Sequence, residues 1–87
     1  SPALTLIELL EARGARVAYH DPFIASIKPS REHGLLTGRK SAALDAKRLK
    51  SSDCVLIVTD HSSYDWAAVA ARSRRVVDTR NALRRGA

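Results

Sequence analysis

The chain has 87 residues, a length that suits one domain with a single hydrophobic core and excludes an enzyme with separate cofactor and substrate lobes. Its apolar fraction of 45% and charged fraction of 28% are ordinary for globular proteins, so a disordered or fibrous chain is disfavoured. Fifteen Lys and Arg against nine Asp and Glu give a net charge of +6, which favours anionic partners such as phosphates, nucleic acid or an acidic membrane surface.

The single cysteine, Cys54, excludes an internal disulfide framework and a cysteine-based zinc site, and it is typical of a reducing compartment. No run approaches the roughly 18 apolar residues that a membrane span needs, and the N-terminus lacks the pattern of a signal peptide. We therefore predict a cytoplasmic protein with no membrane partner. Because Cys54 opens an apolar run, we interpret it as a buried structural residue and not as a nucleophile.

Residues 1–14 predict a helix. Ser1 is suited to the N-cap and Pro2 to the first helical position, and Gly14 can end the helix in the left-handed conformation. Apolar side chains recur at helical spacing, which indicates a helix packed against a sheet or another helix. The recurring residues are Ala3, Leu4, Leu6, Ile7, Leu9 and Leu10.

The remaining elements alternate between strands and helices. Strands are predicted at residues 16–20, 54–59 and 76–77, and helices at residues 43–50 and 65–73. The stretch 23–41 is interpreted as an irregular loop with one short helical turn at most. The run 54–59 is continuously apolar, as expected of a parallel strand covered on both faces. The alternation predicts an α/β fold with right-handed crossovers and an open parallel sheet.

Three polar clusters follow the predicted strands, at residues 20–22, 59–63 and 78–81. Because ligands bind at the carboxyl ends of strands in open parallel sheets, we expect the clusters to meet at one edge and form a site. Arg80 follows an apolar strand, where packing gives no reason for an arginine, and its planar guanidinium suits phosphate oxygens. We therefore favour a ligand role for Arg80.

Other polar residues of these clusters have simpler interpretations. Residues 21–22, an Asp-Pro pair, are more typical of a turn than of a ligand. Asp60 and the serines at 62 and 63 suit either a helix cap or a ligand role, and both stay open. His20 and His61 have no third ligand at metal-like spacing, so no metal site is predicted.

Several familiar motifs are missing. The sequence has no Gly-x-Gly-x-x-Gly, no Walker loop and no Gly-x-Ser-x-Gly, which disfavours a self-contained cofactor site or a serine hydrolase. Arginines near the C-terminus leave the alternative of a non-enzymatic basic module for nucleic acid or another acidic partner. These are Arg72, Arg74, Arg75, Arg80, Arg84 and Arg85. The few aromatic residues mostly occupy predicted core positions, so a solvated basic face is favoured over nucleic-acid binding. They are Tyr19, Phe23, Tyr64 and Trp66.

Four segments, at residues 1–10, 14–22, 51–61 and 76–83, together resemble the C-terminal UDP-binding domain of the UDP-glucose/GDP-mannose dehydrogenase family. Asp60-His61 and the ending Asp78-Thr79-Arg80-Asn81 are most similar to the bacterial UDP-N-acetylhexosamine 6-dehydrogenases. The resemblance implies a Rossmann-like, three-layer parallel sheet flanked by helices. It also implies that residues 1–87 are one UDP-binding domain, truncated at its N-terminus and lacking its first strand.

The resemblance further implies a part of an enzyme of polysaccharide biosynthesis. Family members oxidise the C6 alcohol of a UDP-sugar to a carboxylate in two NAD-dependent steps, through a thioester on a cysteine. The domains that hold NAD and that cysteine are not in this sequence, so Cys54 is not the nucleophile, and this fragment alone is expected to bind no cofactor and to be inactive. Its expected partners are the UDP-sugar and the remaining domains of the parent dehydrogenase.

For individual residues, the resemblance implies that Arg80 reaches into the cleft near the nucleotide-sugar diphosphate, while Asp78 and Asn81 orient that arginine or its loop. The family also has a strand and a lysine-bearing loop before the position of Ser1. In the parent fold that strand lies between the strands at Val17 and Val55. Its loss predicts unpaired edges, lower stability, and homo-oligomers formed through the exposed sheet.

Overall fold

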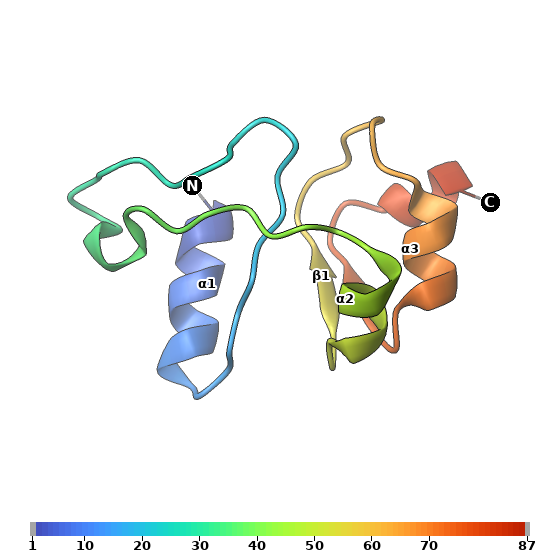
Figure 1. The fold of residues 1–87 in the computed structure, drawn as a ribbon, viewed down its shortest axis with the longest axis horizontal. Helices are drawn as coiled ribbons and strands as arrows, with labels where there is room; N and C mark the ends of the chain where they lie inside the picture. Colours follow the sequence, from blue (N-terminus) through green and yellow to red (C-terminus); the bar gives the residue numbers. More distant parts are fainter. Residues whose placement is uncertain (1, 87) are drawn as a thin grey trace. The chain divides into compact units, whose positions relative to one another are not determined.

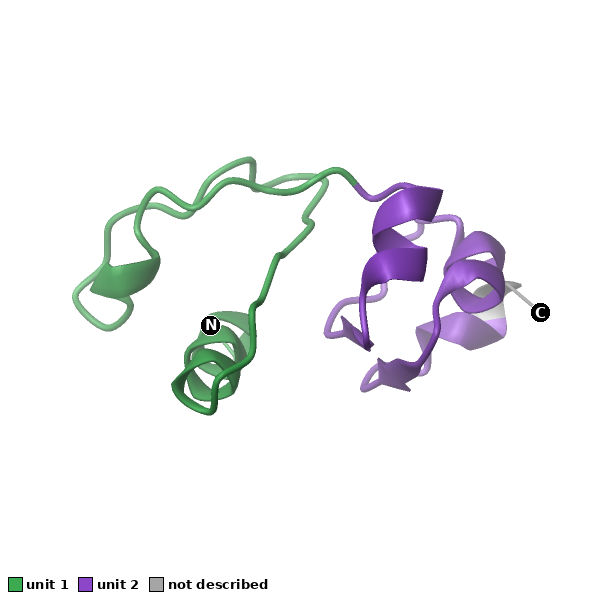
Figure 2. Cartoon of the chain, turned by 60° about the horizontal axis from the view of Figure 1, so that its bottom comes forward, with its two compact units in different colours: residues 1–43 green, residues 44–87 purple. Residues whose placement is uncertain are grey.

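The structure of the chain is a computed structural model that describes residues 2–86, with side chains described as far as residue 84. The helical elements are α1 (Pro2–Ala12), η1 (Gly34–Leu36), α2 (Ala46–Ser51), α3 (Trp66–Arg72) and η2 (Ala82–Gly86), and the strands are β1 (Val55–Ile57) and β2 (Val76–Asp78) (Figure 1). The chain divides into two compact units, residues 1–43 and 44–87, and each has its own small hydrophobic core (Figure 2). The N-cap predicted at Ser1 lies outside the described residues.

The first unit is built on α1, which confirms the predicted helix. Ile7 is buried against Ile27 and Leu36, and partly buried residues pack around these three: Leu4, Val17 and Tyr19. Gly14 has a φ of 96°, the left-handed conformation expected of a residue that ends a helix. Leu9 and Leu10 are exposed, so the predicted apolar stripe is wider than the face that is buried.

Residues 16–20 do not form the predicted strand. In the described part of the chain the sheet contains β1 and β2 alone, and this segment belongs to neither. Tyr19 accepts a backbone hydrogen bond from Ala42, at 2.8 Å, but no ladder of such bonds forms. A β-favouring sequence becomes a strand only when a neighbouring strand takes up its N–H and C=O groups, and here that partner is missing.

The stretch 23–41 is irregular, as predicted, and η1 is its short helical turn. The stretch folds back on itself at an isolated antiparallel bridge between Ser26 and Lys40. Two backbone hydrogen bonds of Ile27 extend this contact. Its N–H donates to the Arg39 carbonyl at 2.9 Å, and its carbonyl accepts from the Gly38 N–H at 2.8 Å. The loop therefore has a defined course although it contains little regular structure.

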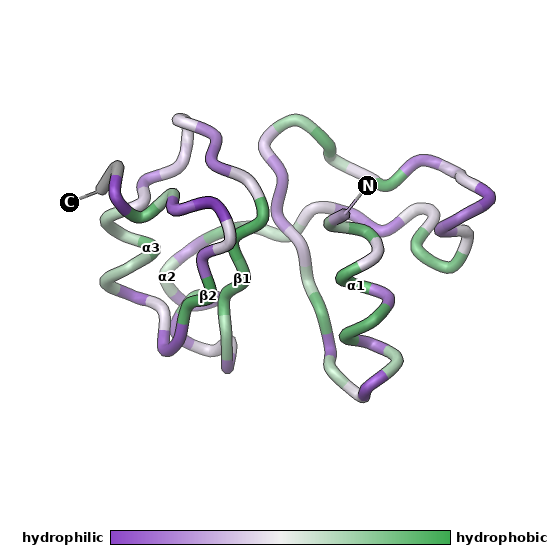
Figure 3. The backbone as a smooth tube through the Cα atoms, turned by 180° about the vertical axis from the view of Figure 1, so that it is seen from behind, coloured by the Kyte–Doolittle hydropathy of each residue, from purple (hydrophilic) through white to green (hydrophobic). Residues whose placement is uncertain are grey.

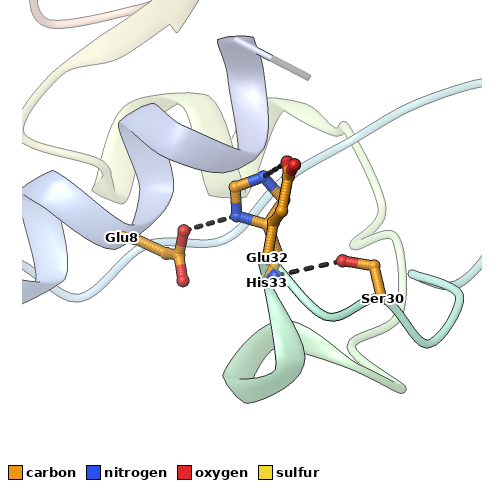
Figure 4. A network of polar contacts seen from close by, with 4 residues as sticks. All are labelled: Glu8, Ser30, Glu32 and His33. Carbon is orange, nitrogen blue, oxygen red and sulfur yellow. Dashed lines mark hydrogen bonds and ion pairs between the residues drawn. The ribbon is translucent and has the colours of Figure 1, made fainter.

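Two side chains of this loop bind the same helix. His33 is buried, and its Nδ1 lies 2.5 Å from the Glu8 carboxylate, while its Nε2 lies 4.0 Å from Glu32 (Figure 4). Arg39 donates from both terminal nitrogens to Glu11, at 2.7 and 2.5 Å, and these bonds lower the pKa of the Glu11 carboxyl. Because Glu8 and Glu11 are three residues apart on α1, the helix holds the loop at two adjacent points.

The second unit contains the sheet. β1 and β2 are parallel, in the register Val55↔Val76, Leu56↔Val77 and Ile57↔Asp78, and α3 connects them. The core consists of Ile57, Trp66, Val69 and Ala82. Asp45 and Asp65 cap α2 and α3, each accepting a hydrogen bond from a backbone N–H three residues on. Both helices and both strands are thus confirmed, with bounds that are shorter than predicted at most ends.

One face of this sheet is open, contrary to the prediction that its central strand is covered on both sides. Val55, Ile57 and Val76 face the core with α3 and η2. Leu56 and Val77, the register pair on the opposite face, remain 36% and 49% exposed. The apolar strands therefore pack on one side alone within residues 44–84, and Figure 3 shows β1 in the strong green of hydrophobic residues.

Two predictions about single side chains are wrong. Cys54 is exposed, because β1 begins one residue later and leaves the thiol at the amino end of the sheet. Phe23 is also exposed, although Trp66 is buried as expected of a core aromatic. Among the described residues, no helix has the length and apolar character required to cross a membrane.

Candidate functional site

The carboxyl ends of β1 and β2 are joined directly. Ile57 and Asp78 are register partners, and the next residue, Thr79, donates two hydrogen bonds to the Ile57 carbonyl oxygen. The first comes from its backbone N–H at 3.0 Å and the second from its Oγ1 at 2.6 Å. Two of the three predicted polar clusters, residues 59–63 and 78–81, therefore begin at the same edge of the sheet.

The Asp78 carboxylate organises the loop that follows β2. Its Oδ1 accepts hydrogen bonds from the backbone N–H groups of Arg80 (3.1 Å) and Ala82 (3.0 Å), and its Oδ2 accepts one from Leu83 (2.9 Å). These bonds hold the pKa of the Asp78 carboxyl below its ordinary value, and the bond from Leu83 has the largest effect. The carboxylate binds main-chain groups of its own loop and so determines the course of that loop.

Asn81 and Arg80 have different roles in this loop. Asn81 has a φ of 58°, a left-handed conformation that asparagine tolerates better than most residues, and this lets the chain turn into η2. Arg80 is exposed, and within the described residues its guanidinium makes no hydrogen bond or ion pair. The loop therefore presents a cation at the sheet edge whose five N–H donors are available for an anion.

The segment after β1 carries an aromatic row at the same end of the strand. The rings of His61 and Tyr64 are stacked with centroids 6.4 Å apart, and the Tyr64 ring lies 4.8 Å from the Trp66 ring. The helix cap considered for Asp60 and the following serines is instead Asp65, whose Oδ1 accepts from the N–H of Ala68 at 3.1 Å. Asp60 itself is half-buried.

The third predicted cluster, residues 20–22, lies in the other compact unit. Asp21 Oδ1 accepts hydrogen bonds from the N–H groups of Phe23 (2.7 Å) and Ile24 (3.1 Å). This geometry confirms the interpretation of Asp21 as a turn former. The position of this cluster at the site edge stays a prediction.

Sequence reasoning missed two contributors to this edge. The sequence pattern makes Thr79 one member of a polar cluster, whereas in the structure its hydroxyl donates to the neighbouring strand. A β-branched hydroxyl residue directly after a strand can signal this role. The contact between the His61 and Tyr64 rings also has a sequence signal. The two residues are three apart, and a tight turn can bring the rings of such residues together. Within residues 2–84, no group of three or more His, Cys, Asp and Glu side chains has an arrangement that could hold a metal ion.

Replacing Asp78 by alanine should loosen the loop and lower the melting temperature by about 5 °C at pH 7, because a group that accepts three backbone N–H bonds is lost. The folded-state pKa of Asp78 is depressed, so its contribution is complete above its unfolded pKa of about 4 and is lost as the pH falls below that value. Thermal melts of the parent chain and Asp78→Ala between pH 3 and 7 measure this.

The difference between the two chains should therefore shrink towards pH 3. The variant Asp78→Asn keeps one acceptor oxygen and should lie between them at pH 7. A difference that is constant over this pH range would contradict the role given to the carboxylate.

The unit 44–87 thus has the features of a Rossmann-like α/β domain. It has parallel strands joined through a helix, and its carboxyl edge presents an exposed arginine in a structured loop. Residues 1–85 match the family model described as the UDP-glucose/GDP-mannose dehydrogenase family, UDP binding domain. The chain belongs to this family. The searches of curated proteins and of solved structures gave no match.

Proposed function

We propose that this chain binds the nucleotide of a UDP-sugar as part of a cytoplasmic, NAD-dependent UDP-sugar 6-dehydrogenase. Membership of the family supports a UDP-binding domain of a nucleotide-sugar dehydrogenase. The Asp-Thr-Arg-Asn ending supports the finer assignment to enzymes that act on UDP-N-acetylhexosamines. In this proposal the domain supplies binding energy for the substrate, and the other domains of the parent enzyme supply the nucleophile and bind NAD.

The observation that carries the proposal is that Arg80 combines a held backbone with an exposed guanidinium. Its backbone is held by Asp78 and by the left-handed turn at Asn81, while its guanidinium is exposed at the carboxyl edge of the sheet. A fixed backbone reduces the conformational entropy that a ligand has to overcome, and a guanidinium binds phosphate oxygens through paired N–H donors. The diphosphate of UDP is an anion of the required kind.

The residues of this chain do not suit the NAD cofactor. A dinucleotide site needs a glycine-rich turn after a strand so that the pyrophosphate can approach the backbone. The segment after β1 is Thr59-Asp60-His61-Ser62-Ser63 and contains no glycine. NAD would therefore bind elsewhere in the parent enzyme, where it accepts the hydride removed from the sugar C6.

The free edge of β1 supports the further proposal that the parent domain has one more strand there. In the described residues β1 pairs with β2 on one side alone. Because β1 is an apolar strand of the kind found inside parallel sheets, its second edge suits another parallel strand. We assign that position to the family's strand that precedes α1, together with the lysine-bearing loop that would add a second cation to the site.

Titration of the chain with UDP tests the proposed function. We expect saturable binding that Arg80→Ala weakens by at least about tenfold, because a charge-assisted hydrogen bond is lost. Arg84→Ala is the matched control, since Arg84 is also exposed and its loss changes the net charge equally. Calorimetry or ligand-observed NMR at constant ionic strength gives the dissociation constants.

The same titration separates this proposal from a basic module for nucleic acid, which the net charge of +6 would also suit. A short DNA duplex at two salt concentrations provides the comparison. The proposed function would be overturned if the chain does not bind UDP. It would also be overturned if Arg80→Ala and Arg84→Ala weaken UDP binding equally. Duplex binding that falls steeply with salt would then favour the alternative.

A further inference from the structure

The aromatic row after β1 runs from the core towards the surface. Trp66 is buried, Tyr64 is half-buried and packs against the same core, and His61 is half-buried beyond it. The ring planes of His61 and Tyr64 differ by 29°, and those of Tyr64 and Trp66 by 42°. A partly exposed aromatic pair is therefore fixed on a buried indole.

This row and the Arg80 loop belong to the same compact unit, residues 44–87. Tyr64 and Leu83 both pack against the core of Ile57, Trp66, Val69 and Ala82, and Leu83 is also bound through its N–H to Asp78. The two segments start from neighbouring strands, which lie about 4.8 Å apart in a sheet. A ligand that binds Arg80 at this edge therefore has aromatic side chains within reach on the next strand's loop.

We propose that His61 and Tyr64 form a stacking surface for the nucleobase of the ligand whose diphosphate binds Arg80. This inference rests on the proposed function and assigns the base to the segment after β1. A pyrimidine has a flat, polarisable face that stacks on aromatic rings, and such contacts tolerate different bases because every base has a π-face. The site would thus recognise a nucleoside diphosphate by two contacts, one with the charge of its phosphates and one with its ring.

The two contacts predict different responses to two ligands. Inorganic pyrophosphate carries the phosphate charge without a base, so it should bind Arg80 and make no contact with the aromatic row. UDP should use both. The ratio of the two dissociation constants therefore isolates the contribution of the base, and it is insensitive to changes that affect the phosphate contact alone.

The experiment compares UDP and pyrophosphate on the parent chain, on His61→Ala and on Tyr64→Leu, which keeps an apolar side chain against the core. We expect each variant to weaken UDP binding on the order of tenfold, and pyrophosphate binding by less than about twofold. Tyr64→Phe, which keeps the ring, should bind UDP like the parent. The H5 and H6 resonances of uracil should move upfield on binding to the parent and not on binding to Tyr64→Leu. Phe23→Ala, which removes an exposed aromatic side chain from the other unit, is the control.

The outcomes separate the two proposals. If Arg80→Ala weakens binding of both ligands while His61→Ala and Tyr64→Leu leave UDP unaffected, the stacking surface is wrong and the proposed function stands. Equal losses for UDP and pyrophosphate in Tyr64→Leu would also overturn it, because they indicate a general disturbance of the edge. If UDP does not bind the parent chain at all, both proposals are wrong.

Discussion

Replacing Leu56 and Val77 together by lysine is expected to abolish concentration-dependent association of this chain. The two side chains are register partners on the open face of the sheet, and the β1 edge beside them has no partner strand among the described residues. An apolar face next to a free strand edge is the surface through which sheets pair with other chains. We therefore propose that a second copy covers this face at high protein concentration.

The size of the effect follows from the area that each side chain leaves exposed. Burying the remaining exposed surface of Leu56 or of Val77 contributes about 1 kcal/mol. A two-fold dimer contains each side chain twice, so the double variant loses about 4 kcal/mol, which raises the dissociation constant by about a thousandfold. Lysine also places two like charges on each copy, which repel across a two-fold interface. Sedimentation velocity over a thousandfold range of protein concentration, about the span of such a shift, measures the change.

Leu35→Lys is the matched control, because Leu35 is 92% exposed but belongs to η1 in the other compact unit and not to the sheet. It should leave association unchanged. A parent chain that is monomeric at every concentration, or a double variant that associates as the parent does, would show that the open face does not mediate self-association.

The sequence was sufficient to predict those elements whose signals are local. The helices α1 and α3 have strong caps or apolar spacing, and β2 is bounded by polar residues on both sides. The segment 16–20 has equally good β propensity, yet it is not a strand, because a strand also depends on a partner that propensity does not provide. The same dependence explains Leu56, whose apolar character predicted a covered face that the described chain leaves open.

The candidate site was predictable in position and less so in its internal contacts. The rule that ligands bind at the carboxyl ends of parallel strands singles out Asp78 and Arg80. The structure has Asp78 at the end of β2, beside the end of β1, and Arg80 in the loop that follows. That Asp78 accepts three backbone bonds, and that Asn81 is left-handed, depends on backbone geometry that residue types suggest only weakly. The contact between His61 and Tyr64 depends on ring orientation, which no sequence pattern specifies.

Replacing Leu36 by alanine is expected to unfold the unit 1–43 while the unit 44–87 keeps its structure. Leu36 is 1% exposed and is one of three buried residues that make up the first core, with Ile7 and Ile27. Removing a leucine from such a position costs about 2–5 kcal/mol, and a small domain has little more stability than that. The second core shares none of these residues.

Two measurements distinguish the units. Hydrogen exchange should show that the amides of α1 and of the Ile27–Arg39 bridge lose protection in Leu36→Ala. Trp66 is the only tryptophan and lies in the second core, so its fluorescence should keep the emission of a buried indole. Leu35→Ala, at the neighbouring exposed position, should change stability by less than about 0.5 kcal/mol. If Trp66 becomes exposed together with the loss of protection in α1, the two cores unfold as one cooperative domain, and the prediction of separate responses is wrong.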